Sequence, residues 1–167
     1  MTVVETILRI VVIGTGATAV MDAWLMALKR MGIQTQNFAM IGRWMGHLFK
    51  GRFAHASIAK AATVPGELAL GWLTHYAVGI AFAGLLVVLR GAAWLHAPAV
   101  LPAVAVGLCT VAFPLFVMQP AMGLGIAASR TPAPWKNRLR SMANHTVFGF
   151  GLYLSALVIA WMLRWVS

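Results

Sequence analysis

The chain has 167 residues, of which 61% are hydrophobic and 10% are charged, and its mean hydropathy is +0.84. A soluble domain carries about a quarter charged residues, so this composition excludes an ordinary water-soluble protein and favours one solvated mainly by lipid. Thirteen Lys and Arg against three acids give a net charge of +10. These basic residues fall mostly between apolar runs, which favours membrane topology and lipid headgroups over nucleic acid as their role. Cys109 is the single cysteine, so an intrachain disulfide and CxxC chemistry are excluded.

Four apolar runs are long enough to cross a bilayer as helices. They lie at about residues 10–28, 68–89, 99–119 and 142–163. At about 1.5 Å of rise per residue, each run reaches roughly 30 Å, which is the thickness of a hydrocarbon core. The sequence therefore predicts an all-α membrane protein with four transmembrane helices, in a single domain over residues 1–167.

The connections between the runs differ in character. Over residues 38–49, apolar side chains recur at helical spacing, while Arg43, His47 and Lys50 fall on the other side. That pattern predicts a short interfacial helix in the first connection, lying flat in the headgroup layer. His47 otherwise reads as a loop residue without ligand spacing, as do His55 and His96. Residues 129–140 are proline-rich and basic, and predict a turn.

Prolines modify the third run. Pro102 falls in its first turn, where a proline is tolerated. Pro114 falls inside the run, where it frees a carbonyl group and is expected to kink the helix. Residues 121–128 are expected to form a short broken or interfacial continuation.

The basic residues are distributed unequally between the two sides of the predicted bundle. Residues 29–66 and 129–141 hold ten of the thirteen, and the opposite side holds Arg9, Arg90 and Arg164. Because basic loops stay in the cytoplasm, both basic connections should be cytoplasmic and both termini periplasmic. The bilayer, with anionic headgroups at the basic loops, is the expected partner, together with further copies of the chain in a homo-oligomer; no nucleic acid is expected.

A few polar residues interrupt the apolar runs. Asp22, His75, Gln119 and His145 would all lie in the cytoplasmic half of the bundle. Ionisable groups inside a membrane are costly unless paired, and they usually face the bundle interior or a water-filled cavity. We therefore predict a substrate or proton site formed by these four residues with Thr18 and Asn144. The alternative is that Asp22 and a histidine only hydrogen-bond each other and hold the helices together.

The two halves of the chain resemble each other. Val20-Met21-Asp22 matches Val117-Met118-Gln119, and Thr74-His75-Tyr76-Ala77-Val78-Gly79 matches Asn144-His145-Thr146-Val147-Phe148-Gly149 as polar-His-x-x-x-Gly. Two parallel helix-pair repeats would explain these matches. The alternative is chance, because short matches are common in apolar sequence.

The pattern favours a small proton- or cation-coupled transporter or channel, in which Asp22 carries a proton or pairs with a cation and His75 titrates beside it. A second hypothesis is a membrane protein that binds haem b or a metal ion through His75 and His145, while the first hypothesis needs no cofactor. A third is a structural or accessory subunit. No catalytic motif is present, so the sequence does not support an enzyme.

Three strings carry a resemblance to a known family. They are His75-Tyr76 with Gly79, the string from Met118-Gln119-Pro120 to Arg130-Thr131-Pro132, and His145 with the residues from Phe148 to Leu154. With these strings, nearly the whole chain resembles a family of small bacterial inner-membrane proteins known as a domain of unknown function. The resemblance implies a four-helix protein of the bacterial inner membrane, and it carries over no activity and no catalytic residue.

Overall fold

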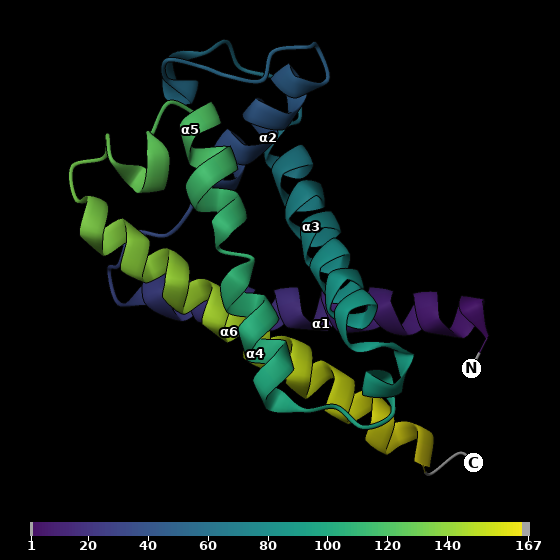
Figure 1. The fold of residues 1–167 in the computed structure, drawn as a ribbon. Helices are drawn as coiled ribbons and strands as arrows, with labels where there is room; N and C mark the ends of the chain where they lie inside the picture. The colour runs from purple at the N-terminus through teal and green to yellow at the C-terminus, as the bar shows by residue number, and fades with distance from the viewer. Residues whose placement is uncertain (1, 165–167) are drawn as a thin grey trace. The chain divides into compact units, whose positions relative to one another are not determined.

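A computed structural model of the chain describes residues 2–164, which form helices and connecting segments without any β-strand. Four helical stretches are long and apolar enough to cross a membrane: Val3–Arg30, Glu67–Arg90, Val100–Ala121 and Pro134–Arg164. Figure 1 shows the first, second and fourth as the long helices α1, α3 and α6, and the third as divided between α4 and α5. The predicted all-α fold class is confirmed.

The helices have the following bounds: α1 is Val3–Arg30, α2 is Phe38–Leu48, α3 is Glu67–Arg90, α4 is Val100–Cys109, α5 is Gln119–Ala121 and α6 is Pro134–Arg164. Short 3₁₀ turns lie at Ile58–Lys60, Ala92–Leu95 and Ile126–Ala128, and a π-helical turn at Pro114–Met118. The helix α2 was predicted from its periodicity and is confirmed.

Local sequence explains why α1 is longer than its apolar run. The Thr2 hydroxyl caps the helix by accepting a hydrogen bond of 3.2 Å from the Glu5 amide. Glu5 in the first turn, and Lys29 and Arg30 in the last turn, complement the helix dipole. The chain then turns at Gly32, whose φ of +76° suits glycine.

The helix α6 also begins earlier than its apolar run, at Pro134. The prediction of a turn through residue 140 is wrong, because the turn ends before Pro134. Proline is well suited to the first position of a helix, where its missing N–H would have no partner in any case. Lys136, Arg138 and Arg140 therefore lie on α6.

The third apolar run is interrupted near its middle. The helix α4 ends at Cys109, Thr110 follows as its C-cap, and a π-helical turn starts at Pro114. Pro114 has no N–H to donate to the carbonyl of Thr110, four residues earlier, and its ring crowds that carbonyl. The run is thus interrupted at the residue whose carbonyl Pro114 leaves without its helical donor, while the kink itself stays a prediction.

The chain divides into two compact units. Unit 1 comprises Met1–Ile33, Tyr76–Thr110 and Asn144–Ser167, and unit 2 comprises Gln34–His75 and Val111–Ala143. The single domain over residues 1–167 stays a prediction.

Small residues let the helices of unit 1 approach closely. A methyl group at Gly14 of α1 would lie 2.5 Å from Ile80 Cα of α3, and one at Gly107 of α4 would lie 2.5 Å from Gly149 Cα of α6. A methyl group at Gly151 of α6 would lie 2.9 Å from Ala17 Cα of α1. Small residues at such contacts are typical of packed membrane helices, because they bring the backbones together.

Both polar-His-x-x-x-Gly strings end in a glycine that lies at one of these helix contacts. Gly79 of α3 packs against the Thr18 side chain of α1, and Gly149 of α6 packs against the α4 backbone at Val104. The two strings therefore share a packing role. The wider duplication of a helix pair stays a prediction.

Unit 2 has its own core. Trp44, Ile58, Ala121 and Met122 form a buried hydrophobic cluster. The segment between α2 and α3 is bound by its backbone to the end of α5: the His55 amide donates to the Ala121 carbonyl at 2.8 Å, and the Ile58 amide donates to the Met122 carbonyl at 3.0 Å.

Candidate functional site

The predicted site residues fall in both units. Thr18, Asp22, Asn144 and His145 belong to unit 1, whereas His75 and Gln119 belong to unit 2. Each group is described by itself. The joining of all six into one site, and the pairing of Asp22 with His75, stay predictions.

Asp22 of α1 accepts a hydrogen bond from α3 within unit 1. The Tyr76 hydroxyl donates to Asp22 Oδ2 at 2.8 Å, and both side chains are half-buried. The antiparallel packing of α1 on α3 brings these two residues together, because Gly79 contacts Thr18 one turn away. The sequence analysis included Tyr76 only as part of a string and missed it as a site residue. Its signal was the polar hydroxyl directly after His75, in a run of apolar residues.

His145 of α6 is hydrogen-bonded to α4. Its Nδ1 lies 2.9 Å from Thr110 Oγ1, and the same hydroxyl lies 2.5 Å from the Gly107 carbonyl oxygen. Thr110 is buried, with 6% of its surface exposed. The sequence analysis missed Thr110, because its position depends on where α4 ends.

Asn144 connects α6 to α1. Its Oδ1 accepts a hydrogen bond of 3.0 Å from the indole nitrogen of Trp24. Trp24 lies two residues after Asp22, and Asn144 directly precedes His145.

The three hydrogen bonds form what we call the polar layer: Asp22 and Trp24 of α1, Tyr76 of α3, Thr110 of α4, and Asn144 and His145 of α6. All four membrane-capable stretches contribute to it. Three members, Tyr76, Thr110 and Asn144, are the residues at which the chain enters or leaves unit 1. Thr18 is fully buried one turn from Asp22, and its hydroxyl donates to the Gly14 carbonyl of its own helix at 2.8 Å. The layer can bind or exchange a proton at a carboxylate and at an imidazole.

His75 lies among aromatic rings in unit 2. Its ring centroid is 4.8 Å from that of Phe38 and 5.9 Å from that of Trp72, and the Phe38 and Trp72 rings stack at 4.1 Å. The approach of α2 to α3 depends on glycines, because a methyl group at Gly71 would overlap the Phe38 carbonyl. This arrangement orients the His75 imidazole against α2.

Gln119 follows the π-helical turn directly. Its Oε1 is buried and has no hydrogen-bond partner among the residues that the structure describes. A buried amide oxygen without a donor is costly, and π-helical turns are frequent at functional sites. Gln119 therefore retains its place among the predicted site residues.

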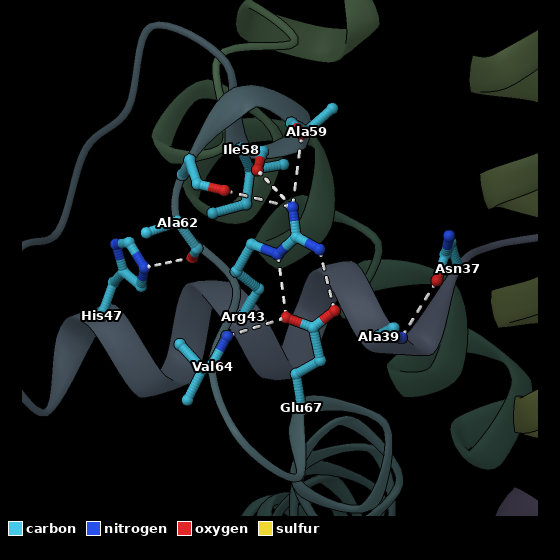
Figure 2. A network of polar contacts seen from close by, with 10 residues as sticks. Asn37, Ala39, Arg43, His47, Ile58, Ala59, Ala62, Val64 and Glu67 are labelled. Atoms are coloured by element: carbon cyan, nitrogen blue, oxygen red, sulfur yellow. Dashed lines mark hydrogen bonds and ion pairs between the residues drawn. The ribbon is translucent and has the colours of Figure 1, made fainter.

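An ion pair in unit 2 holds the segment between α2 and α3, as Figure 2 shows. Arg43 binds both carboxylate oxygens of Glu67, at 2.8 and 2.9 Å, and donates at 3.3 Å to the carbonyl groups of Ile58, Ala59 and Ala61. The Val64 amide also donates to Glu67, at 3.1 Å. The hydrogen bonds to Glu67 raise the pKa of the Arg43 guanidinium above its ordinary value. These contacts give Arg43 a structural role.

Two buried histidines connect the same segment to α2. His47 Nε2 lies 2.9 Å from the Ala62 carbonyl oxygen, and His55 Nε2 lies 2.9 Å from His47 Nδ1. His47 belongs to α2 and is buried, so its expected position in a loop is wrong. Burial lowers the pKa of His55 below its ordinary value, because the charged form loses its hydration. The pair was not predicted, because His55 lies after the end of α2, in a segment whose return to the helix no local pattern specifies.

Metal ligands do not gather in the part of the chain that the structure describes: residues 2–164 contain no group of three or more His, Cys, Asp or Glu that could hold a metal ion. His75 and His145 belong to different units, so the binding of haem b or a metal ion between them stays a prediction. No activity is assigned by these contacts.

Together, the fold and the polar layer define an all-helical protein with four helices long and apolar enough to cross a membrane and polar side chains between them. Its family is also defined: the chain belongs to the family described as "Protein of unknown function (DUF2938)", whose model matches residues 11–159. The resemblance to a family of unknown function is thereby confirmed. Neither a curated protein nor a solved structure matches the chain.

Proposed function

We propose that the protein is a multi-pass protein of the bacterial inner membrane and that its polar layer binds a proton during coupled transport. The observation that carries the proposal is the hydrogen bond from Tyr76 to the Asp22 carboxylate between two apolar helices. A carboxylate at such a position costs several kcal/mol in hydrocarbon unless it is hydrated, paired or protonated. Asp22 is therefore the residue at which binding of a positive charge is most favourable.

The neighbouring residues support a proton as the bound species. His145 belongs to the same layer through α6, which packs on α1 at Gly151 and at Asn144. An imidazole and a carboxylate can each take up and release a proton. One layer thus contains two groups that can exchange a proton, one on α1 and one on α6, and both belong to unit 1.

The charge distribution supports an orientation. Residues 29–66 and 129–141 hold ten of the thirteen basic residues, and Lys136, Arg138 and Arg140 lie on the first turns of α6. In a bacterial inner membrane, the positive-inside rule puts both segments in the cytoplasm and both termini in the periplasm. The polar layer, two turns from the end of α1 at Asp22, then lies in the cytoplasmic half of the bilayer.

Proton uptake by proteoliposomes tests the proposal, because a proton is the one substrate that the layer itself suggests. Purified protein is reconstituted in liposomes that contain a pH-sensitive dye, and a potassium diffusion potential, negative inside, drives proton entry. Wild-type protein should acidify the lumen faster than protein-free liposomes do. Asp22→Asn should reduce uptake to the protein-free rate, because an amide side chain does not take up and release a proton as a carboxylate does.

Two controls separate loss of function from loss of fold. Asp22→Asn keeps an acceptor for the Tyr76 hydroxyl, so its elution volume and helical content should equal those of the wild type, whereas Asp22→Leu should weaken the bundle. Glu5→Gln changes another carboxylate on the same helix, outside the polar layer, and should leave uptake unchanged. Uptake that is equal in wild type and Asp22→Asn, or absent from both, would overturn the proposal.

A further inference from the structure

Thr110 contacts one of the two ring nitrogens of His145, Nδ1, at 2.9 Å. We propose that Thr110 is a positioning residue that keeps Nδ1 of His145 protonated, so that His145 takes up and releases its proton at Nε2. The assignment uses the polar layer of the proposed function, but it does not require that protons cross the membrane.

The argument starts from the single hydrogen of the Thr110 hydroxyl. Thr110 Oγ1 lies 2.5 Å from the Gly107 carbonyl oxygen, and a carbonyl oxygen can only accept. The hydroxyl hydrogen is therefore used in that bond. At the 2.9 Å contact with His145 Nδ1, the hydroxyl must accept, so Nδ1 must donate.

The chemistry of imidazole gives the rest. A neutral histidine carries hydrogen on one ring nitrogen, and a charged histidine carries hydrogen on both. With Nδ1 as donor to Thr110, the neutral ring of His145 has its lone pair on Nε2, and the charged ring differs from it only at Nε2. Nδ1 therefore stays protonated in both states, and proton exchange is confined to one atom.

The fold explains why Thr110 can perform this role. It is the C-cap of α4, where the chain stops being α-helical because Pro114 supplies no N–H to the Thr110 carbonyl. The contact of Gly107 with Gly149 brings α4 and α6 close enough for a short hydroxyl to reach the ring. Thr110 is also buried, so water does not compete easily for the hydrogen bond.

Nitrogen-15 NMR of the full chain in detergent micelles tests the assignment. The protein is labelled at its histidine ring nitrogens, and the His145 signals are identified by their loss in His145→Gln. In wild-type protein, the Nδ1 signal should be that of a protonated nitrogen throughout the titration, and the Nε2 signal should move from an unprotonated to a protonated position as the pH falls. Thr110→Ser keeps the hydroxyl and should preserve this pattern.

The informative variant is Thr110→Val, which keeps the shape of the side chain and removes its acceptor oxygen. Its neutral His145 should show the two tautomers mixed, with at least a tenfold loss of preference for Nδ1–H. A residue that merely caps α4 would alter stability and leave the tautomer unchanged. Hydrogen on Nε2 in neutral wild-type protein, or an identical tautomer in Thr110→Val, would overturn the assignment. Neither outcome depends on the flux measurement, so the two proposals can fail separately.

Discussion

The Tyr76 hydroxyl donates a hydrogen bond of 2.8 Å to Asp22 between α3 and α1. One turn along the same interface, Gly79 packs against the Thr18 side chain. The Thr18 hydroxyl donates its hydrogen to the Gly14 carbonyl of α1, its own helix. Asp22 thus lies in an interface set by small residues, and its carboxylate is held from the facing helix. The first prediction tests this interface directly.

Removal of the tyrosine hydroxyl should weaken the α1–α3 contact. Tyr76→Phe deletes the donor to Asp22, and a hydrogen bond to a charged group contributes about 1.5–3 kcal/mol. We expect the free energy of unfolding in mild detergent to fall by about this amount, as measured by denaturant titration followed by circular dichroism. Tyr153→Phe removes the other tyrosine hydroxyl, on α6, and should change stability much less. Equal losses in both variants would contradict the role of the Asp22 bond.

The second prediction concerns overpacking at the close contact between α4 and α6. In Gly149→Ala the new methyl group would lie 2.7 Å from Val104 Cα, so α4 and α6 must separate. We expect a loss of about 1–3 kcal/mol in the free energy of unfolding, which a thermal melt would detect as a lower midpoint. Gly84→Ala is the matched control, since its nearest atom would be a side-chain carbon at 3.8 Å. The interpretation fails if the control is as unstable as Gly149→Ala.

The sequence predicted the helices well where apolar composition and period decide the structure. The four apolar runs became the four membrane-capable stretches, and the periodicity of residues 38–49 became α2. The start of α6 was not predicted, because Pro132, Pro134 and three basic residues are typical of a turn, although proline also suits the first position of a helix.

The contacts of the site were less predictable than the helices. Asp22 and His145 could be selected because polar groups in apolar runs are costly, and this holds for any arrangement of the helices. Their observed partners, Tyr76 and Thr110, depend on the rotation of α3 and on the end of α4, which no local pattern specifies. The pair of His47 and His55 likewise depends on the return of a long segment to α2.

That histidine pair makes a prediction about pH. The pKa of His55 is lowered from its ordinary value of 6.5, chiefly by burial. When the segment between α2 and α3 detaches from the protein, His55 is exposed and binds a proton at a higher pH than it does in the folded structure. The packing of this segment on α2 is therefore most stable at a pH above the ordinary pKa of histidine, and it becomes less stable as the pH falls below that pKa. Hydrogen exchange of the His55 and Ile58 amides, corrected for its intrinsic pH dependence, should show less protection at about pH 5.5 than at about pH 7.5.

Two variants distinguish the pair from a general effect of acid. His55→Gln should reduce the pH dependence of protection, because the residue that takes up the proton is gone. His96→Gln changes a histidine that does not belong to the pair and should leave the dependence intact. If protection in His55→Gln varies with pH as it does in the wild type, His55 is not the titrating group.

The last prediction concerns the break after α4. Pro114→Ala restores an N–H that can donate to the Thr110 carbonyl, so the third run should become a more regular helix. A regular helix rotates the residues around Thr110 and should separate its hydroxyl from His145 Nδ1. We expect slower hydrogen exchange near residue 114, together with a loss of the Nδ1–H preference of His145 in the nitrogen-15 spectrum. Pro102→Ala is the matched control, because Pro102 lies in the first turn of α4, where its N–H would have no helical partner. A His145 spectrum that is unchanged in Pro114→Ala, with exchange near residue 114 slowed as expected, would show that Thr110 reaches His145 without the proline break.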